Sequence, residues 1–298
     1  MEARTLVSID GALTPPEEAV VSVFDRGFLY GDSVYEVLRT YAGRPFEQGA
    51  HLERLQASAE CIGLTLPWPL ERLGAELEAA LAASGHAELG VESYLRLMVT
   101  RGAGEISLDP GLATGPRRVI VVRPLPQPPR ETYDEGIALA VVGVRRNPRD
   151  TVDPAAKTGN YLNNVLALGE ARGRGAAEAV MLDGEGRLTE GSSSNLFVVR
   201  GGVVLTPPAQ TGILVGITRQ VIFQVAAEAQ IPLREEDLGV PELLSADEAF
   251  ITSSIREILP ATRCDGRPIG GGQVGPLTRA LQDAFRARTG APFGDPRF

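Results

Sequence analysis

The chain has 298 residues, of which 43 % are hydrophobic and 22 % charged, a composition typical of a globular protein with one large or two ordinary domains. Its net charge is −9 and its basic residues form no run, which argues against a nucleic-acid partner. No apolar run approaches a membrane span and the N-terminal residues do not resemble a signal peptide, so we expect no membrane association and a cytoplasmic protein. The two cysteines, the two histidines and the lack of HExxH, Walker and GxSxG motifs argue against a disulfide framework, a transition-metal site, a P-loop and a serine hydrolase.

The first 122 residues predict alternating strands and helices. Residues 33–46 indicate two short strands around a turn at Ala42-Gly43. Residues 49–64 and 69–84 predict helices, with Leu52, Leu55, Ala59 and Ile62 on the apolar face of the first and Leu70, Leu73, Leu77 and Leu81 on that of the second. Residues 91–102 and 117–125 predict strands, and alternation in the first places Ser93, Leu95, Leu97 and Val99 on one face.

A proline-rich segment separates the two predicted domains. It runs from 123 to 136 and contains Pro124, Pro126, Pro128 and Pro129, a density that excludes a helix or a central strand there. We therefore predict a small N-terminal domain over 1–122, a linker over 123–136 and a larger domain over 137–298.

The second domain is richer in strand patterns. Residues 137–146 predict a strand, and residues 177–208 predict hairpins with turns at Asp183-Gly184 and Gly201-Gly202. One helix should follow Asn160 as its N-cap and pack through Leu162, Val165, Leu166 and Gly169. A second helix begins near Thr218, a strand within 247–260 ends in a polar turn, and the glycines of 266–276 indicate a turn before the final helix rather than a phosphate loop.

Lys157 is the only lysine of the chain, beside 28 arginines. A guanidinium stays protonated in proteins, whereas a lysine amine can lose its proton in a desolvated site and attack a carbonyl. Arginine therefore cannot replace a lysine that forms a Schiff base. The alternative is a lysine kept by chance on a solvated surface, and the surrounding residues must decide.

Three further features fit a single ligand. Glu190 ends a strand before the turn GSSSN, where its carboxylate either holds a protonated ring nitrogen or is simply solvated. The start of a helix at 216–218 offers backbone N–H groups to an anion, although Thr218 also fits an ordinary N-cap. The hydroxyls of 252–254 add donors. With Lys157 and the phenol of Tyr161, this set describes pyridoxal phosphate.

The motifs as a whole resemble one enzyme family. They are DRGFLYGDSVYEVLRTY (25–41), HLERL (51–55), EGSSSNLF (190–197), ILVGITR (213–219) and FITSSIREILP (250–260). The chain is similar to the fold-type IV (class IV) pyridoxal-phosphate transaminases, which include branched-chain aminotransferases, D-amino acid transaminases and aminodeoxychorismate lyase. The resemblance implies an α+β, two-domain fold: a small N-terminal α/β sandwich and a larger C-terminal pseudo-barrel domain that binds the cofactor. It also implies a homodimer whose pockets borrow residues from the neighbour.

The resemblance assigns roles to individual positions. Lys157 corresponds to the lysine that carries the cofactor and moves the substrate α-proton, Tyr161 to the tyrosine near the phenolic oxygen and Glu190 to the partner of the pyridine nitrogen. The other implied cofactor contacts are Leu214, against the ring, and Arg54, Gly216, Ile217, Thr218, Ser253 and Ser254, around the phosphate. The implied substrate pocket comprises Tyr30, Tyr35, Val37, Arg39, Tyr94, Arg96, Ile255 and Arg256. Strand alternation independently places Tyr94 with Arg96, and Tyr35 with Val37 and Arg39.

The resemblance implies ping-pong amino transfer from a branched-chain type of amino acid to a 2-oxo acid such as 2-oxoglutarate. KTGNYLNNVLA (157–167) and SYLR (93–96) favour the branched-chain group, but Val37 replaces a usual glycine and Ile255-Arg256 a usually small pair. Arg256 either points to solvent, which is the favoured interpretation, or anchors a substrate carboxylate. Arg26 is a second candidate anchor for that carboxylate.

Other functions remain open at the level of sequence. A D-amino acid or (R)-amine transaminase, or a lyase-like enzyme, fits the same scaffold, although one D-specific design is disfavoured because a PRNH-like run is missing from 100–113. The glycines of 102–113 permit that loop to close over the site. A cofactor-binding protein without catalysis is a third hypothesis, and the intact set of Lys157, Tyr161 and Glu190 argues against it.

Overall fold

The computed structural model describes residues 3–126 and 128–290. The chain divides into two compact units, which are described separately. The first consists of residues up to 126 together with 156–160, and the second of the remaining described residues up to 290. The segment that carries Lys157 therefore belongs to the N-terminal unit, although it lies 30 residues further along the chain.

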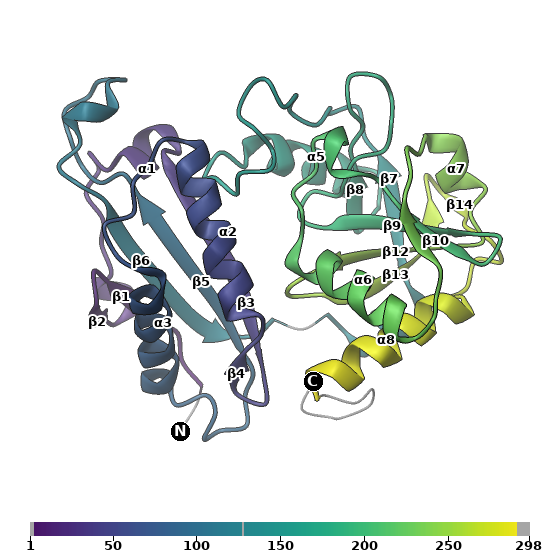
Figure 1. The fold of residues 1–298 in the computed structure, drawn as a ribbon, viewed down its shortest axis with the longest axis horizontal. Coiled ribbons are helices and arrows are strands. Elements are labelled where there is room, and N and C mark those ends of the chain that lie inside the picture. The colour runs from purple at the N-terminus through teal and green to yellow at the C-terminus, as the bar shows by residue number, and fades with distance from the viewer. Residues whose placement is uncertain (1–2, 127, 291–298) are drawn as a thin grey trace. The chain divides into compact units, whose positions relative to one another are not determined.

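The first unit is built on a six-stranded sheet in the order β2-β1-β6-β5-β3-β4 (Figure 1). Every pairing in it is antiparallel. The strands are β1 (Leu6–Ile9), β2 (Ala12–Thr14), β3 (Ser33–Tyr41), β4 (Arg44–Pro45), β5 (Ser93–Thr100) and β6 (Arg117–Pro124). The short helical elements are η1 (Pro16–Glu18), α1 (Arg26–Tyr30) and η2 (Pro110–Leu112).

Two helices, α2 (Gln48–Cys61) and α3 (Leu70–Ser84), pack on one face of this sheet (Figure 1). The predicted apolar faces are confirmed, because their leucines and Ala59 join one buried core with the inward residues of β3, β5 and β6. Alternation along β5 is confirmed too, since Ser93, Leu95, Leu97 and Val99 are buried. One face of the sheet is therefore covered by helices. The side chains that alternate with the buried ones point to the opposite face.

Residues 156–160 extend this sheet along the edge of β3. The N–H of Tyr35 donates to the carbonyl of Lys157 at 3.0 Å, and the N–H of Gly159 donates to the carbonyl of Ser33 at 2.8 Å. Gly159 is required at this approach, because a Cβ there would lie 2.3 Å from the Ser33 hydroxyl. These bonds fix the backbone that carries Lys157.

The second unit is built on a mixed sheet in the order β11-β10-β9-β12-β13-β7-β8, with β14 paired to β13. The pairs β10–β11, β13–β7 and β7–β8 are parallel and the others antiparallel. The strands are β7 (Ile137–Val141), β8 (Glu178–Val180), β9 (Asn195–Arg200), β10 (Val203–Thr206), β11 (Leu233–Glu235), β12 (Glu248–Ser253), β13 (Glu257–Cys264) and β14 (Arg267–Pro268). The predicted turns at Asp183-Gly184 and Gly201-Gly202 are confirmed.

Hydrogen bonds outside the regular strands close part of this sheet into a ring. Beyond β8, the N–H of Met181 donates to the carbonyl of Glu190 at 3.0 Å. Glu190 in turn bridges to Asn195, the first residue of β9. The path β9-β12-β13-β7-β8 is thereby completed through Glu190, which accounts for the expected pseudo-barrel.

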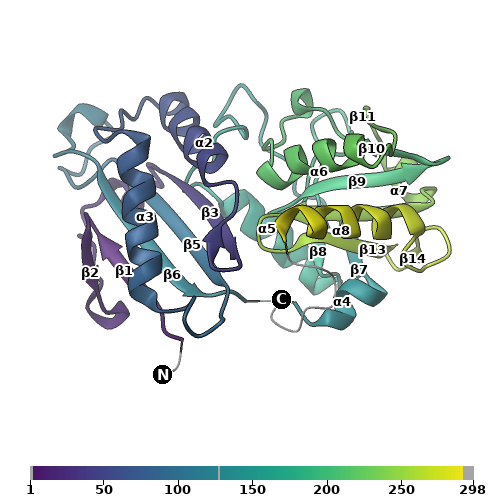
Figure 2. The ribbon, with the colours of Figure 1, turned by 60° about the horizontal axis from the view of Figure 1, so that its bottom comes forward.

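Helices and an apolar interior complete the second unit. They are α4 (Arg130–Glu135), α5 (Leu162–Gly173), η3 (Ala209–Thr211), α6 (Ile217–Glu228), α7 (Val240–Leu244) and α8 (Pro276–Thr289). Figure 2 shows α6 and α8 side by side, and both contact β12. One buried cluster fills the sheet interior around Leu196, Val198 and Ile251, and a second, alanine-rich cluster lies beneath α5.

The prediction for α5 is wrong in two respects. Leu162, Val165 and Leu166 are 69 %, 61 % and 56 % exposed, whereas Ala167 and Ala171 are buried against small residues of β7 and β8. Close packing of the helix on the sheet selects small side chains, which a count of large apolar residues does not detect. Asn160 is not the N-cap, because Tyr161 holds that position.

Other boundaries differ from the sequence pattern. Within 123–136, β6 continues to Pro124 and α4 spans Arg130–Glu135, while residue 127 lies outside the described residues. The strand expected over 137–146 ends at Val141. The alternative of Thr218 as N-cap of α6 is wrong, because Gly216 holds that position.

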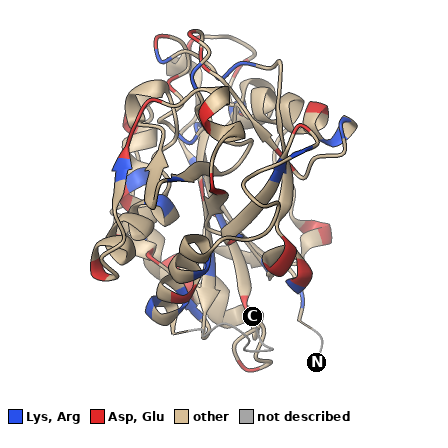
Figure 3. Cartoon of the chain, turned by 90° about the vertical axis from the view of Figure 1, so that its right-hand side faces the viewer, with Lys and Arg blue, Asp and Glu red and all other residues tan. Residues whose placement is uncertain are grey.

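Acidic and basic positions are interspersed along the chain (Figure 3). In the part of the chain that the structure describes, no helix has the length and apolarity needed to cross a bilayer. Within the same ranges, no group of three or more His, Cys, Asp and Glu side chains is arranged to hold a metal ion.

Candidate active site

Lys157 is held by its backbone and placed beside an aromatic ring. Its N–H donates to the hydroxyl of Ser58 on α2 at 3.0 Å, and its carbonyl accepts from Tyr35. Its Nζ lies 4.5 Å from the centroid of the Tyr35 ring. The side chain is half-buried with its amine beside this ring, which is not the fully solvated position that the chance hypothesis expects.

Arg54 is fixed by a buried carboxylate. Its Nε and Nη2 each donate to an oxygen of Glu36 at 2.7 Å, and His51 Nδ1 lies 2.7 Å from the same carboxylate. Burial raises the pKa of Glu36, but the charge of Arg54 and hydrogen bonds from Arg54 and His51 together lower it to about 2. Burial lowers the pKa of His51, so its ring is neutral at neutral pH. Bidentate bonding leaves Arg54 in one orientation.

Glu36 and His51 were missed by the sequence analysis. A signal was available, because Glu36 interrupts the apolar alternation of a strand, and His51 and Arg54 stand three residues apart on one helix face. A carboxylate on the helix-covered face of a sheet needs cationic or donor partners on the covering helix.

The predicted substrate residues of β3 and β5 gather on one face of the sheet. Val37 lies opposite Arg96, and Arg39 lies opposite Tyr94, in the antiparallel register of the two strands. The Arg96 guanidinium carbon lies 3.9 Å from the centroid of the Tyr35 ring. This face is opposite to the one on which Glu36 and Arg54 meet, because neighbouring residues of a strand point to opposite sides.

Arg26 has a role within its own unit rather than a free guanidinium. It is buried, its Nε donates to Asp32 at 3.1 Å, and its Nη1 donates to the carbonyl of Ser107 at 2.7 Å. The guanidinium carbon of Arg26 lies 5.0 Å from the centroid of the Tyr30 ring. Arg26 thus ties loop 102–113 to α1, and the hypothesis that it anchors a substrate carboxylate loses its basis.

In the second unit, Glu190 is buried where the barrel closes. One of its oxygens lies 2.8 Å from Arg146 Nε, and the other accepts from the N–H of Leu214 at 3.1 Å and from Asn195 Nδ2 at 3.3 Å. The alternative of a solvated glutamate is wrong, because Glu190 is only 5 % exposed. Arg146 was missed by the sequence analysis, and nothing in its strand-end position pointed to Glu190.

The start of α6 has the features of an anion site. Its N-cap is Gly216, so no side chain caps the first turn, and Thr218 is buried in that turn. Gly216 is required because a Cβ would lie 2.1 Å from the Asn195 side-chain oxygen. The buried hydroxyl of Thr252 has no hydrogen-bond partner among the described residues. Ser253 is the last residue of β12, and Ser254 begins the turn that follows.

These features fit the phosphate and ring nitrogen of pyridoxal phosphate. A phosphate accepts hydrogen bonds, and in the second unit the uncapped helix start and the hydroxyls are donors. Glu190 is a carboxylate with an arginine on one oxygen, as a partner for a protonated ring nitrogen should be. Tyr161 and Leu214 are half-buried residues of the same unit.

Arg256 does not point into solvent, the position favoured for it from the sequence. Its Nη2 donates to Glu178 at 2.7 Å, and its side chain is 20 % exposed. Ile255, beside it in the same turn, is half-buried.

The structure thus distributes the predicted residues over both units. The first holds Lys157, Arg54, Tyr30, Tyr35, Val37, Arg39, Tyr94 and Arg96. The second holds Tyr161, Glu190, Leu214, Gly216, Ile217, Thr218, Ser253, Ser254, Ile255 and Arg256.

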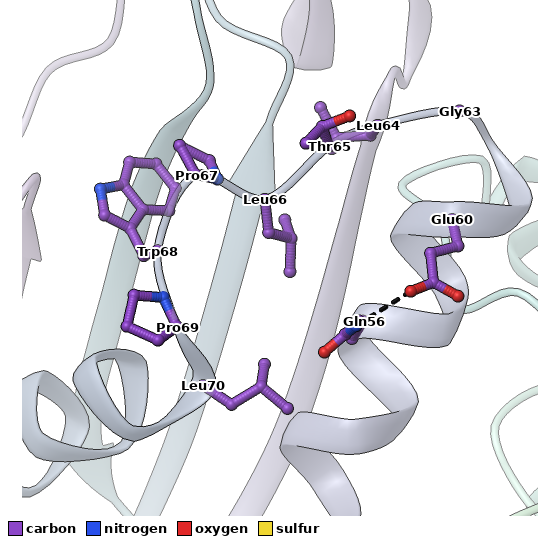
Figure 4. Close-up of a pocket in the computed structure, with 10 residues that line it drawn as sticks. All are labelled: Gln56, Glu60, Gly63, Leu64, Thr65, Leu66, Pro67, Trp68, Pro69 and Leu70. Carbon is purple, nitrogen blue, oxygen red and sulfur yellow. Dashed lines mark hydrogen bonds between the residues drawn. The ribbon is translucent and has the colours of Figure 1, made fainter.

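A hollow of about 660 Å³ in the first unit is a separate feature (Figure 4). It is lined by Gln56, Glu60 and the segment 63–70, which includes Trp68. None of the predicted site residues lines it, so it is distinct from the site that the motifs indicate.

Comparison with known proteins identifies the family of this chain. The family model described as amino-transferase class IV matches residues 33–264, which is most of the chain. The chain belongs to the class IV aminotransferases. This family uses pyridoxal phosphate, so the aminotransferase is a pyridoxal-phosphate enzyme.

Individual relatives cover nearly the whole aminotransferase. A Methanocaldococcus jannaschii protein, provisionally named as a branched-chain-amino-acid aminotransferase, is 39 % identical over 94 % of this chain and 95 % of its own length. A D-alanine aminotransferase of Staphylococcus aureus is 37 % identical over 94 % of this chain and 96 % of its own. The crystal structure of a Thermoproteus uzoniensis branched-chain aminotransferase with norvaline aligns with a TM-score of 0.87 at 37 % identity, covering 96 % of this chain and 95 % of that one.

Proposed function

We propose that this aminotransferase moves the amino group of a branched-chain amino acid to a 2-oxo acid such as 2-oxoglutarate by a ping-pong mechanism. The observation that carries the proposal is the face formed by Tyr35, Val37 and Arg96, in which a guanidinium adjoins an aromatic ring and an aliphatic side chain. Such a face suits a substrate with a carboxylate and an apolar side chain. The relatives named as branched-chain aminotransferases support the same assignment.

The residues of the chain would divide the chemistry among them. When bound, pyridoxal phosphate supplies an electron sink next to the substrate α-carbon. Lys157 would act as the base that takes the α-proton and returns it to the neighbouring position, because it is the one amine side chain of the sequence. Glu190 would hold the ring nitrogen, and Tyr161 the phenolic oxygen.

The residues proposed to hold the phosphate are all hydrogen-bond donors. Arg54 would provide a guanidinium whose orientation is set by Glu36. The first turn of α6, from Gly216 to Thr218, would provide backbone N–H groups. Ser253 and Ser254 would add hydroxyl donors.

A second candidate function is D-amino acid transamination. The D-alanine aminotransferase of S. aureus is 37 % identical to this chain, against 39 % for the M. jannaschii relative of branched-chain name, and each match covers 94 % of this chain. A pocket for either substrate uses a cation for the carboxylate, so Arg96 does not distinguish them.

A half-reaction separates the two functions. The purified protein would receive L-leucine or D-alanine without any 2-oxo acid, while the visible absorption band of the bound cofactor is recorded, with 2-oxoglutarate alone as the control. The proposal predicts loss of the band with L-leucine and little change with D-alanine. Loss with D-alanine alone would assign the D-specific function instead.

We also propose a homodimer. Several large apolar side chains are exposed in each unit, among them Phe28 and Leu108 in the first and Leu162, Val165 and Leu166 on α5 in the second. Exposed apolar side chains that neighbour one another are typical of interfaces. Light scattering during size-exclusion chromatography would contradict this proposal if the mass were that of one 31.6 kDa chain.

A cytoplasmic location is the last part of the proposal. The sequence has only two cysteines, and burial raises the pKa of the Cys264 thiol to about 12. A chain with so few cysteines, one of them a buried thiol, does not depend on an oxidising compartment. Fractionation of the native host with an antibody to the protein would test this.

A further inference from the structure

Arg256 lies at the centre of a hydrogen-bonded group inside the second unit. Its Nη2 donates to the Glu178 carboxylate at 2.7 Å and to the Ser193 hydroxyl at 3.0 Å. Its backbone N–H and its Nε both donate to the Ser253 hydroxyl oxygen at 3.3 Å. The side chain therefore joins the start of β8, the loop 191–194 and the turn after β12.

Glu178 holds the other side of this group. It is fully buried, and it accepts hydrogen bonds from the N–H and hydroxyl of Ser192 and from the hydroxyl of Ser194. Burial pushes the pKa of Glu178 up, but the charge of Arg256 and the bonds from Ser192 outweigh it and leave that pKa below its ordinary value. The carboxylate is thus ionised, and it attaches loop 191–194 and Arg256 to one point.

The bonds at Ser253 have a chemical consequence. A hydroxyl oxygen has two lone pairs and one proton. With two N–H groups of Arg256 on the lone pairs, the Ser253 hydroxyl has only its proton left to use. A phosphate is an acceptor, so a serine restricted to donating is matched to it.

We propose that Arg256 is a positioning residue for the cofactor phosphate: with Glu178 it holds the Ser253–Ser254 turn and sets Ser253 as a hydrogen-bond donor. The inference rests on the proposed assignment of that turn to the phosphate. It also removes Arg256 from the substrate pocket, because its guanidinium is engaged by Glu178 and Ser193. Loop 191–194 leads into Asn195, which pairs with Thr252 across β9 and β12, so the same group connects the turn to the strand beside Glu190.

The test compares a phosphorylated with a non-phosphorylated ligand. Apoprotein of the wild type, Arg256→Met, Arg256→Lys and Ser253→Ala would be titrated with pyridoxal phosphate and with pyridoxal, and the Kd of each measured by fluorescence. We expect Arg256→Met and Ser253→Ala each to weaken pyridoxal phosphate about tenfold, the value of one charge-assisted hydrogen bond, and to leave pyridoxal unchanged. Arg256→Lys keeps the charge toward Glu178 but lacks the second donor to Ser253, so its loss should be intermediate.

The double variant Arg256→Met/Ser253→Ala separates positioning from simple stabilisation. If Arg256 acts through Ser253, the double variant binds pyridoxal phosphate no more weakly than either single variant. Circular dichroism of the apoproteins controls for folding. Should Arg256→Met fail to fold, Arg256→Lys takes its place, because it keeps the charge toward Glu178 and loses only the side-chain donor to Ser253.

Several outcomes would overturn the inference. One is a Kd for pyridoxal phosphate within twofold of the wild type in Arg256→Met or Ser253→Ala. Another is an equal loss for pyridoxal. A raised KM for 2-oxoglutarate with an unchanged Kd for the cofactor would make Arg256 a substrate anchor. Failure of the wild type to bind pyridoxal phosphate would overturn the cofactor assignment of this chain and the role of Arg256 with it, whereas normal binding by the wild type with any of the outcomes above would overturn the role of Arg256 alone.

Discussion

Two fully buried carboxylates, one in each unit, each bind one arginine, and they do so in different ways. Glu36 gives both oxygens to Arg54 and shares one of them with His51. Glu178 accepts one hydrogen bond from Arg256 and others from hydroxyl and backbone groups of loop 191–194. Glu36 therefore orients the guanidinium of Arg54. Glu178 instead holds a loop in place, and Arg256 is one of several groups bonded to it.

Because of this difference, removal of the charge of Glu36 should lower the free energy of unfolding more than removal of the charge of Glu178. A buried ion pair that loses one member leaves the other uncompensated. Arg54 is more enclosed than Arg256, with 14 % against 20 % of its side chain exposed, and Arg256 also donates to the neutral hydroxyls of Ser193 and Ser253.

The largest expected effect on stability is that of Glu36→Gln. The change keeps the side-chain volume but leaves Arg54 without its buried counter-charge, and the free energy of unfolding should fall by about 3–5 kcal/mol. Urea titration of the apoprotein measures this. A loss below about 1 kcal/mol would mean that Glu36 is not the group that holds Arg54.

Glu178→Gln is the matched change in the second unit and should cost less. The amide can still accept hydrogen bonds from the Ser192 group, and Arg256 keeps its neutral partners, so we expect a loss of about 1–3 kcal/mol in the same titration. An equal or larger loss than that of Glu36→Gln would reverse the comparison.

The dependence of stability on pH should further distinguish the contribution of Glu36. The pKa of Glu36 is about 2 in the folded protein against 4.5 for the free group, so the unfolded chain binds a proton first as the pH falls. The stability that this carboxylate contributes is therefore complete above about pH 4.5 and is lost between there and pH 2. Urea midpoints measured downward from pH 7 should fall more steeply for the wild type than for Glu36→Gln, and parallel curves would contradict the assignment.

The smallest effect is expected at the surface. Arg72 pairs with Glu76 one helical turn away on α3, with 56 % of the arginine side chain exposed. Arg72→Ala should change the free energy of unfolding by at most about 0.5 kcal/mol, because exposed ion pairs gain little over hydration. A loss comparable to that of Glu178→Gln would show that burial is not what separates these pairs.

The parts of this architecture that could be predicted follow from periodicity and from motifs. The apolar faces of α2 and α3 and the alternation of β5 could be predicted because large side chains fill the core of the first unit. The face of α5 could not, because alanines form its contact with the sheet and its large apolar residues are exposed.

The site shows the same division. Lys157 and Glu190 stand out in the sequence through composition and motif, whereas Glu36, Arg146 and Glu178 act through partners that are distant in the sequence. Their roles depend on how strands and helices pack, as the 18-residue separation between Glu36 and Arg54 illustrates. The same reason explains why Arg256, which resembled an exposed arginine, is bonded to a residue 78 positions away.

The central claim is that Lys157 is the catalytic amine of a pyridoxal-phosphate transaminase, and Lys157→Ala tests it most directly. Wild type and variant would be loaded with cofactor and mixed with L-leucine while the visible band is followed in a single turnover. We predict that the variant still binds the cofactor but converts it at least about 10²-fold more slowly, as expected for loss of a general base. A variant that kept the spectrum and the full rate of the wild type would contradict the account.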